Sequence, residues 1–275
     1  MNEEGWLERK KQGIGGSEIS ALLGVNPYKT PYQLWRDKTG RSPPVSDNRY
    51  LRTGRLMEPV IAELFRQETN YQILENSEEN HLYIHPEHSF ILGTPDRIYR
   101  DLEGREGILE CKNTRFPINI EHFPKTWLCQ IQYYMGLTKI EQGEIAYLSQ
   151  GVDFAHIKLE FVADFYHYMV EKAVDFWQKY VQTDCPPPLE TSGDVEKMFH
   201  SSISGKCVAA TESTIAIVSE LKNIRDQMNS LSEKEKKIIE QIKMIMRDSE
   251  ALTDGEDILV TWKTSKNNKR IFIIK

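Results

Sequence analysis

The segment from residue 96 to residue 112 constrains the fold more than any other part of the sequence. Two strand-like patterns, Asp96–Tyr99 and Ile108–Lys112, flank the hydrophilic, glycine-containing segment Asp101–Gly107, and this arrangement predicts a β-hairpin. Strongly helical patterns lie on either side of it, at Arg55–Glu68 and Trp127–Leu137. Because strands placed between helices indicate a mixed α/β core, we expect an α/β (α+β) fold in which helices flank a mixed central sheet.

The remaining predicted elements fit the same core. The helix predicted at Ser17–Leu23 begins with a serine that is a candidate cap. Proline is tolerated in the first turn of a helix, so Pro59 places Glu58 near the start of the helix at Arg55–Glu68. The other predicted helices are Pro31–Asp37 and Ala163–Val181, and the other predicted strands are His81–Ile84, Phe90–Leu92, Glu144–Leu148 and His156–Glu160.

A proline-rich run divides the chain into two parts. Cys185 is followed by three prolines and Leu189, and consecutive prolines make a stiff linker. We therefore expect a core domain at residues 1–188 and a C-terminal arm at residues 189–275.

The arm has its own periodicity. Apolar residues follow a 4-3-4-3 spacing from Ile217 to Ile245, interrupted by the charged Glu235, which indicates a helical hairpin or a coiled-coil arm. Strand patterns at Ile258–Lys263 and Arg270–Ile274 then predict a closing β-hairpin with a basic surface. Such an arm is typical of packing or oligomerisation, and the basic hairpin is a candidate contact for DNA or for an annealing partner.

Composition excludes several classes of protein. The 275 residues include 5 Trp, 12 Tyr and 10 Phe, and so many aromatic side chains could not stay solvated in a disordered chain. No apolar run approaches the roughly 18 residues that span a bilayer, and the acidic start lacks the apolar region of a signal peptide, so we expect no membrane anchor. The four cysteines form no CxxC pair, which argues against a disulfide framework or a zinc ribbon and favours a reducing cytoplasm.

Charge is distributed unevenly along the chain. The formal net charge is −6, yet residues 1–60 contain ten Lys and Arg against seven acids, and residues 261–275 contain five basic residues and no acid. Net charge is therefore a poor guide to partners. A metal-using enzyme that acts on a polyanion needs basic residues that bind the substrate and an acidic pocket that binds the metal. An ordinary surface of mixed charge would give a similar distribution of charged residues.

The predicted hairpin gathers three side chains that can do chemistry. If its turn centres near residue 103 or 104, Asp96 lies opposite residue 111, within one residue of register. Side chains alternate along a strand, so Glu110 and Lys112 share one face and converge with Asp96. Two close carboxylates repel each other unless a cation joins them, and hard oxygen ligands suit Mg²⁺ or Mn²⁺. Lys112 could then orient and help deprotonate an attacking water, or neutralise charge in the transition state. For these three residues alone, an exposed hairpin with a salt bridge is the alternative.

The wider pattern resembles a known group of enzymes. Pro95-Asp96, thirteen residues, then Glu110-Cys-Lys112, with Glu58 on a preceding helix and Gln130-x-x-x-Tyr134 on a following one, is similar to the PD-(D/E)XK nuclease superfamily. The segments Gly13–Ser20 and Leu23–Pro31, followed by Leu34-Trp35, resemble more closely the YqaJ-type viral recombinase family. That family is the phage alkaline exonuclease group that includes lambda exonuclease. The resemblance covers about residues 6–182 and implies a restriction-endonuclease-like core.

The resemblance implies roles for individual residues. Asp96 and Glu110 would be metal ligands, with the backbone carbonyl of Cys111 as a further ligand, and Lys112 would be the catalytic lysine. Two more residues match the family motifs: Glu58 would position water or a second metal, and Gln130 would support the lysine and the nucleophile.

A further site concerns the DNA end. Ser17 matches the family serine that binds a 5′-terminal phosphate together with an upstream basic residue. A hydroxyl and free backbone N–H groups at a helix start, beside Gly15-Gly16, also make a reasonable anion cradle without the resemblance. The basic position falls in Arg9-Lys10-Lys11, where Lys10 or Lys11 aligns best, and a lysine offers a point charge where an arginine offers a fork.

The resemblance implies a Mg²⁺-dependent deoxyribonuclease, with Mn²⁺ able to substitute, that degrades one strand of duplex DNA from its 5′ end and leaves 3′ overhangs. It also implies a homo-oligomer, a trimeric ring, that works with a single-strand annealing recombinase in the cytoplasm of a bacterium carrying the phage or prophage. Two alternatives stay open: a structure-specific or restriction-type endonuclease on the same core, and a catalytically idle DNA-binding scaffold.

Overall fold

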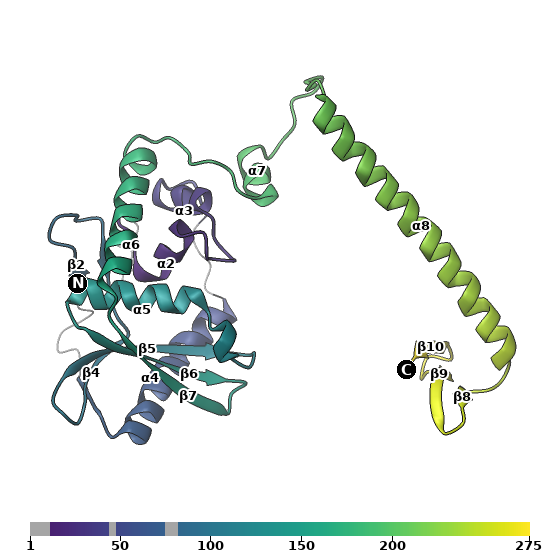
Figure 1. Ribbon diagram of the computed structural model, residues 1–275, viewed down its shortest axis with the longest axis horizontal. Coiled ribbons are helices and arrows are strands. Elements are labelled where there is room, and N and C mark those ends of the chain that lie inside the picture. The colour runs from purple at the N-terminus through teal and green to yellow at the C-terminus, as the bar shows by residue number, and fades with distance from the viewer. Residues whose placement is uncertain (1–11, 44–47, 75–81) are drawn as a thin grey trace. The chain divides into compact units, whose positions relative to one another are not determined.

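The computed structural model describes residues 12–43, 48–74 and 82–275. The core of the part of the chain up to Ser201 is a five-stranded sheet in the order β1-β4-β5-β6-β7 (Figure 1). The β5–β6 pair is parallel and the other three pairs are antiparallel, so the sheet is mixed, as the sequence predicts. The strands are β1 (Gln72–Leu74), β4 (Arg97–Arg100), β5 (Glu106–Thr114), β6 (Gln142–Ser149) and β7 (Asp153–Glu160).

The parallel pairing of β5 with β6 dictates where the next helix lies. Parallel neighbours cannot be joined by a tight turn, so the chain must cross over one face of the sheet. Helix α5 (Lys125–Thr138) makes this crossover, and its return path brings its side chains over the centre of β5. The position of α5 is therefore a direct consequence of the strand order.

Two apolar clusters cover the two faces of the sheet. Helix α4 (Arg49–Thr69) packs Ile61 and Phe65 against Leu109 of β5 on one face. On the opposite face α5 packs against Ile108, together with α2 (Gly16–Leu22), α3 (Pro31–Lys38) and α6 (Ala163–Phe176) (Figure 1). Alternate residues of β5 thus face different helices. Glu110 and Lys112 therefore lie on the α5 side with Ile108, whereas Cys111 lies on the α4 side with Leu109.

Helix α4 begins earlier than the sequence predicts. Asn48 caps it by accepting hydrogen bonds from the backbone N–H groups of Tyr50 and Leu51, so the helix starts at Arg49. Pro59 then lies inside the helix and not in its first turn, which corrects the placement of Glu58 near the helix start. One missing amide donor is tolerated here because the apolar face of a 21-residue helix stays packed on the sheet.

A short ribbon and a long helix complete this part of the chain. Strands β2 (Tyr83–Ile84) and β3 (Leu92–Gly93) pair in an antiparallel ribbon, so the predicted strand at Phe90–Leu92 begins two residues later than expected. His81, the first residue of the other predicted strand, lies outside the described residues. The long helix predicted at Ala163–Val181 is α6 continued by a π-helical turn at Trp177–Val181.

The first compact unit extends to Ser201, beyond the boundary at residue 188 that the prolines predict. Helix α7 (Ser192–Met198) explains the difference. The fully buried carboxylate of Asp194 accepts hydrogen bonds from the Thr30 hydroxyl at 2.8 Å and from the Gln33 side-chain amide at 3.1 Å. These contacts fasten the residues after the proline run to α3.

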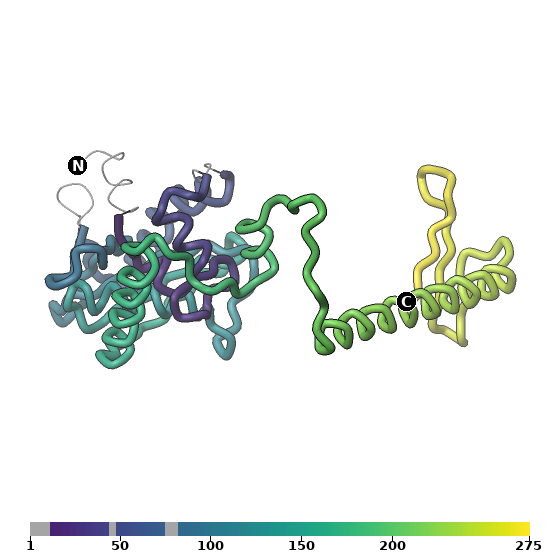
Figure 2. The backbone as a smooth tube through the Cα atoms, turned by 90° about the horizontal axis from the view of Figure 1, so that it is seen from above, coloured from purple at the N-terminus to yellow at the C-terminus, as the bar shows by residue number. Residues whose placement is uncertain are grey.

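The second unit, Ser202–Lys275, consists of one helix and a small sheet. Helix α8 (Glu212–Met246) is a single unbroken helix of 35 residues, so the helical-hairpin alternative is wrong for this arm (Figure 2). The predicted closing hairpin is present as β9 (Asp257–Thr264) and β10 (Arg270–Ile274). A third strand that the sequence did not predict, β8 (Ala251–Asp254), pairs with β9.

Candidate active site

The register of the β4–β5 hairpin decides which polar residues meet. Arg97 pairs with Leu109 and Arg100 with Glu106, so the ladder places Asp96 level with Glu110, one residue from the expected position. The backbone N–H of Asp96 donates to Oε1 of Glu110 at 3.3 Å, and the N–H of Cys111 donates to Oδ2 of Asp96 at 2.8 Å. The two carboxylates therefore lie beside each other, held by the backbone of both strands.

The Glu110 carboxylate is fully buried and contacts the ammonium group of Lys112, whose side chain is partly buried. Its Oε2 accepts a hydrogen bond from Nζ of Lys112 at 2.9 Å. Burial, and then the negative charge of Asp96, raise the pKa of Glu110 to about 7, although Lys112 acts in the opposite direction. Burial opposes the charged form of Lys112, but the charges of Glu110 and Asp96 outweigh it and raise the pKa of the ammonium. The site therefore holds a charged lysine next to a carboxyl group that ionises reluctantly without a further cation.

Helix α5 supplies the third side of the site. Nζ of Lys112 also donates to Oε1 of Gln130 at 2.9 Å, and Nε2 of Gln130 faces the hydroxyl of Tyr134 at 3.5 Å. A one-turn spacing puts Gln130 and Tyr134 on the same face of the helix. The lysine is thus fixed between a strand carboxylate and a helix amide, which leaves little rotational freedom to its ammonium group.

Glu58 lies on the other face of the sheet, and its contact with the site is made by Arg97, a residue that the sequence did not point to. Oε1 of Glu58 accepts a hydrogen bond from the Arg97 guanidinium at 2.6 Å, and the same nitrogen donates to the backbone carbonyl of Asp96. Burial raises the pKa of Glu58 and the charge of Asp96 adds to the effect, whereas Arg97 and Lys112 lower it. The only signal for Arg97 in the sequence was its position directly after Asp96, which points its side chain to the opposite face.

Ser17 lies in the first turn of α2 and is exposed, but it is not the helix cap. The cap is Gly15, whose N–H donates to the Glu18 carboxylate at 3.0 Å, so the candidate cap at Ser17 is wrong. The start of α2 is nevertheless joined to the site through Tyr134. A Cβ atom at Gly16 would lie 2.6 Å from the Tyr134 ring, and the space is open only because the residue is glycine.

The same tyrosine ring also packs against the strand side of the site. A Cβ atom at Gly93, three residues before Asp96, would also lie 2.6 Å from the Tyr134 ring. The predicted basic cluster that would accompany Ser17, namely Arg9, Lys10 and Lys11, lies outside the described residues.

The donor set fits a hard divalent cation. Asp96 and Glu110 offer adjacent carboxylate oxygens, the ligand type that Mg²⁺ takes in ones and twos together with water and substrate phosphate. Among residues 12–43, 48–74 and 82–275, no three His, Cys, Asp or Glu side chains form a complete metal cage. The Thr94 hydroxyl is buried beside the site with no hydrogen-bond partner in the described part of the chain, as expected where a hydrated ligand binds.

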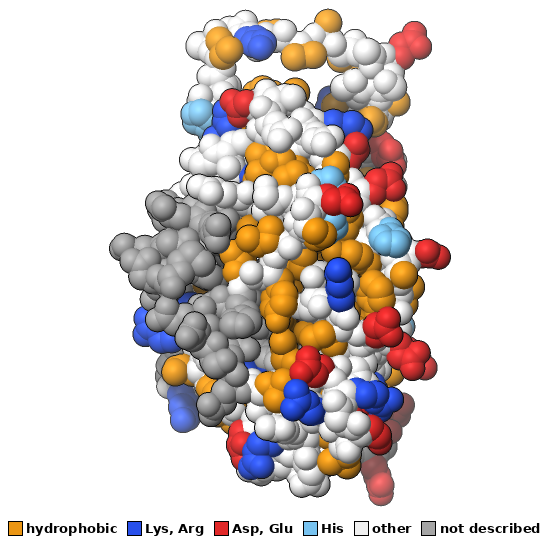
Figure 3. Space-filling view, turned by 90° about the vertical axis from the view of Figure 1, so that its left-hand side faces the viewer, with side chains coloured by type: hydrophobic (Ala, Val, Ile, Leu, Met, Phe, Trp, Pro, Cys, Tyr) orange, Lys and Arg blue, Asp and Glu red, His pale blue; other side chains and the backbone are white. Residues whose placement is uncertain are grey.

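Basic residues accumulate where the start of α4 meets the end of β5. The guanidinium groups of Arg49 and Arg115 each lie 5.0 Å from the ring centroid of Tyr50, and Arg52 and Arg55 follow as exposed residues along the helix. On the face shown in Figure 3, by contrast, Lys and Arg side chains are interspersed with Asp and Glu. The basic stretch is therefore carried by the two elements that also carry Glu58 and the Glu110–Lys112 pair.

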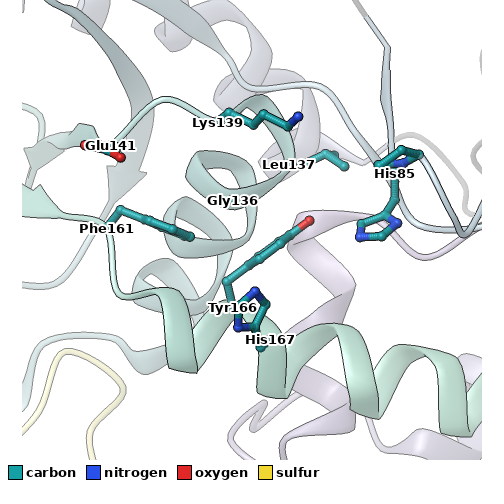
Figure 4. Close-up of a pocket in the computed structure, with 9 residues that line it drawn as sticks. His85, Gly136, Leu137, Lys139, Glu141, Phe161, Tyr166 and His167 are labelled. Atoms are coloured by element: carbon teal, nitrogen blue, oxygen red, sulfur yellow. The ribbon is translucent and has the colours of Figure 1, made fainter.

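A cavity elsewhere in the first unit has different chemistry. His85, Lys139, Phe161, Tyr166 and His167 are among the residues that line it, and none of the predicted site residues does (Figure 4). Tyr166 packs over Gly136 of α5, so this hollow lies at the C-terminal end of the helix, more than one turn beyond Gln130.

Solved structures share this fold. The alkaline exonuclease LHK-Exo from Laribacter hongkongensis superposes with a TM-score of 0.51 at 15% identity, over 66% of this chain and 93% of that chain. The same exonuclease in complex with dAMP gives a TM-score of 0.51 at 16% identity, with the same coverage. The mixed central sheet flanked by helices, which the sequence predicts, is thus a fold that this chain shares with an alkaline exonuclease.

A sequence comparison supports the resemblance to a known family. Residues 5–141 match the model of the YqaJ-like viral recombinase domain, which confirms the resemblance that the sequence shows. The chain is 29% identical over 281 residues to the uncharacterized protein YqaJ of Bacillus subtilis (strain 168), covering 98% of this chain and 86% of that protein. It is also 22% identical over 217 residues to the uncharacterized protein R354 of Acanthamoeba polyphaga mimivirus, covering 73% of this chain and 35% of that protein. In the described part of the chain, no helix combines the length and apolar character that a bilayer crossing requires.

Proposed function

We propose that this protein is a metal-dependent exonuclease that degrades one strand of duplex DNA from its 5′ end and leaves a 3′ single-stranded overhang. The observation that carries the proposal is the buried contact of Glu110 with Lys112, and of Lys112 with Gln130, beside Asp96 in an exonuclease fold. A paired acid and ammonium in a buried, water-poor setting are costly to fold, and such groups cluster where chemistry needs them.

We assign each role from this arrangement together with the family resemblance. Asp96 and Glu110 would hold Mg²⁺, which Mn²⁺ could replace, and the resemblance implies the backbone carbonyl of Cys111 as a further ligand. Bound there, the ion supplies positive charge to the phosphate that is attacked. Lys112, fixed by Gln130, orients the attacking water and offsets the negative charge that develops on the phosphate.

Glu58 would position water or a second metal from the other face of the sheet, and its hydrogen bond from Arg97 would hold the Glu58 carboxylate in place. Two helices and one hairpin thus meet at one phosphodiester bond.

We assign recognition of the 5′ end of the DNA to the first turn of α2. Ser17 is exposed one residue after Gly16, which packs on the Tyr134 ring next to Gln130. A terminal phosphate bound by Ser17 with Lys10 or Lys11, and with Arg9 close by, would set the first phosphodiester at a fixed spacing from Lys112. The basic residues at the start of α4 would receive the adjacent backbone of the duplex.

For the assembly, we propose a homo-oligomer built as a trimeric ring that threads duplex DNA. The 3′ overhang would pass to a single-strand annealing recombinase. We propose that the protein acts in the cytoplasm of a bacterium that carries the phage or prophage.

Digestion of linear duplex tests the function. We expect nucleotide release in Mg²⁺ but not in EDTA, and faster release from 5′-phosphorylated ends than from 5′-hydroxyl ends. A charge-assisted contact to phosphate contributes about 1.5–3 kcal/mol, which corresponds to roughly a 10- to 150-fold rate difference if realised in the transition state. Ser17→Ala combined with Lys10→Ala and Lys11→Ala should remove the preference and preserve slow cutting of hydroxyl ends.

Closed circular duplex is the matched control. An exonuclease needs an end, so the circle should survive conditions that consume the linear form. Nicking of the circle would instead establish an endonuclease on the same core. If no metal-dependent nucleotide release is detected, the result would favour the alternative that the protein is a DNA-binding scaffold without catalytic activity.

A further inference from the structure

Helix α8 exposes a continuous apolar stripe. Six large apolar residues recur at intervals of four and three, with one interruption at Glu235, and their side chains are between 45% and 66% exposed. They are Ile217, Leu221, Ile224, Met228, Leu231 and Ile238. A helix with such a stripe is stable in water only when another surface covers it.

The unit's own sheet covers only the last turns of the helix. Met246 is buried there, and the ammonium of Lys243 lies 5.4 Å from the ring centroid of Trp262 in β9 and 5.7 Å from that of Phe272 in β10. The helix is about 52 Å long at 1.5 Å per residue, so most of the stripe lies beyond the reach of this small sheet. Its partner is therefore another molecular surface.

The spacing specifies that surface. An apolar repeat with a mean period of 3.5 residues faces a partner continuously only when helices supercoil around each other, with the apolar residues at heptad positions a and d. Leu221 and Met228 occupy position a, while Ile217, Ile224 and Leu231 occupy position d. The stripe thus has the geometry of a coiled-coil seam.

The charges flanking the stripe complement a second copy of the same helix. Position g holds Glu220, and position e of the next heptad holds Arg225. In a parallel, in-register coiled coil these two positions on neighbouring helices lie side by side, so each interface gains a pair of opposite charges. Glu235 falls at position a, and the adjacent g position of the neighbouring copy supplies Lys234 to balance it.

We infer that α8 associates with α8 of other copies of this chain in a parallel, in-register coiled coil. Isoleucine predominates at position d, and the seams that favour more than two strands carry isoleucine there, so the seam joins three or four copies. The inference rests on the arm alone and not on the proposed nuclease activity. It adds an interface formed by residues outside the domain that matches the family model.

Disulfide cross-linking of the full-length protein tests the arrangement. The exposed Cys185 and Cys207 are first replaced by serine, and Met228→Cys is then introduced in the seam. In a parallel register the new thiols meet, so mild oxidation should convert the monomer band on a non-reducing gel to covalent dimer. Ser230→Cys, two residues further along and on the outer face of the helix, is the matched control and should remain monomeric.

A second seam position fixes the orientation. Leu221→Cys should cross-link as well as Met228→Cys, because every core position meets its own copy in a parallel bundle. In an antiparallel pair centred at residue 228, two copies of residue 221 would lie about 21 Å apart along the axis and could not bond. Cross-linking of Met228→Cys alone, equal cross-linking of the Ser230→Cys control, or no cross-linking at either seam position would each overturn the inference. The readout requires no DNA, so it stands apart from a failure of the nuclease proposal.

Discussion

The substitution Glu110→Gln tests how burial of one active-site carboxyl group changes the pH dependence of the free energy of unfolding. Glu110 is fully buried, and its pKa is raised to about 7 by burial and by Asp96, compared with an ordinary value of 4.5. Between these two pH values the folded protein holds a proton that the unfolded chain has released. The free energy of unfolding must therefore fall as the pH rises through this window, and it should level off above it. Glutamine has no proton to lose, so the variant should lack this slope.

The magnitude follows from the two pKa values. For a single carboxyl group that titrates at about 7 when folded and at 4.5 when unfolded, linkage gives a loss of about 2.5 kcal/mol between pH 5 and pH 8. The unfolding free energy of the unsubstituted protein minus that of Glu110→Gln should fall by this amount. A difference between two proteins cancels the titration of every group that they share, and it removes any pH-independent effect of the substitution.

Urea unfolding followed by tryptophan fluorescence, in EDTA and at half-unit pH steps, measures this difference. Glu63→Gln serves as the control, because Glu63 is exposed and its hydrogen bonds from Arg66 and Gln67 lower its pKa to about 2. Its folded titration lies near pH 2 and its unfolded titration is mostly complete at pH 5, so its difference curve should be nearly flat between pH 5 and pH 8. Added Mg²⁺ should stabilise the unsubstituted protein at pH 8 and leave Glu110→Gln unchanged. A flat or rising curve for Glu110→Gln would refute the buried-carboxylate description of the site.

Three further predictions test the site and its support. Lys112→Ala should reduce nucleotide release by at least about 100-fold while DNA binding measured by fluorescence anisotropy persists, and loss of both together would contradict a catalytic role. Burial raises the pKa of Glu58 and Arg97 counteracts it, so Arg97→Ala should move the rise of activity to higher pH; unchanged pH–rate profiles would refute the coupling. Gly136→Ala would place a Cβ atom 2.2 Å from a tyrosine ring and should destabilise by about 1–3 kcal/mol, whereas Gly54→Ala, with open space on α4, should stabilise by about 0.5–1 kcal/mol in thermal unfolding.

The convergence of Asp96, Glu110 and Lys112 could be predicted because it depends on local rules. Strand alternation puts Glu110 and Lys112 on one face whatever the tertiary context, and a hairpin turn fixes the opposite strand to within one residue. The observed register differs from the expected one by a single residue. The carboxylates still meet, because backbone N–H groups of each strand reach across the ladder to the other side chain.

Helix ends could not be predicted as well, because the sequence offers several competing caps. Ser17 is a good cap by residue type, but the Glu18 side chain reaches back to the N–H of Gly15 and starts α2 one residue earlier. Pro59 has the preference of a first-turn residue, yet Asn48 caps the helix eleven residues before it. Asn48 lies outside the segment expected to be helical, whereas Glu18 lies inside its segment and acts on a residue before it.

The role of Arg97 depends on which helix covers which face of the sheet, and no local pattern contains that information. Alternation puts Asp96 on the α5 side and Arg97 on the α4 side, so a reading of the hairpin alone separates them. Only when α4 packs on the face of Leu109 does Glu58 come within reach of Arg97, whose guanidinium also bonds the Asp96 carbonyl. A site assembled across both faces of one strand is therefore sensitive to the packing of α4, and substitutions under that helix should alter the position of Glu58 before they disturb Lys112.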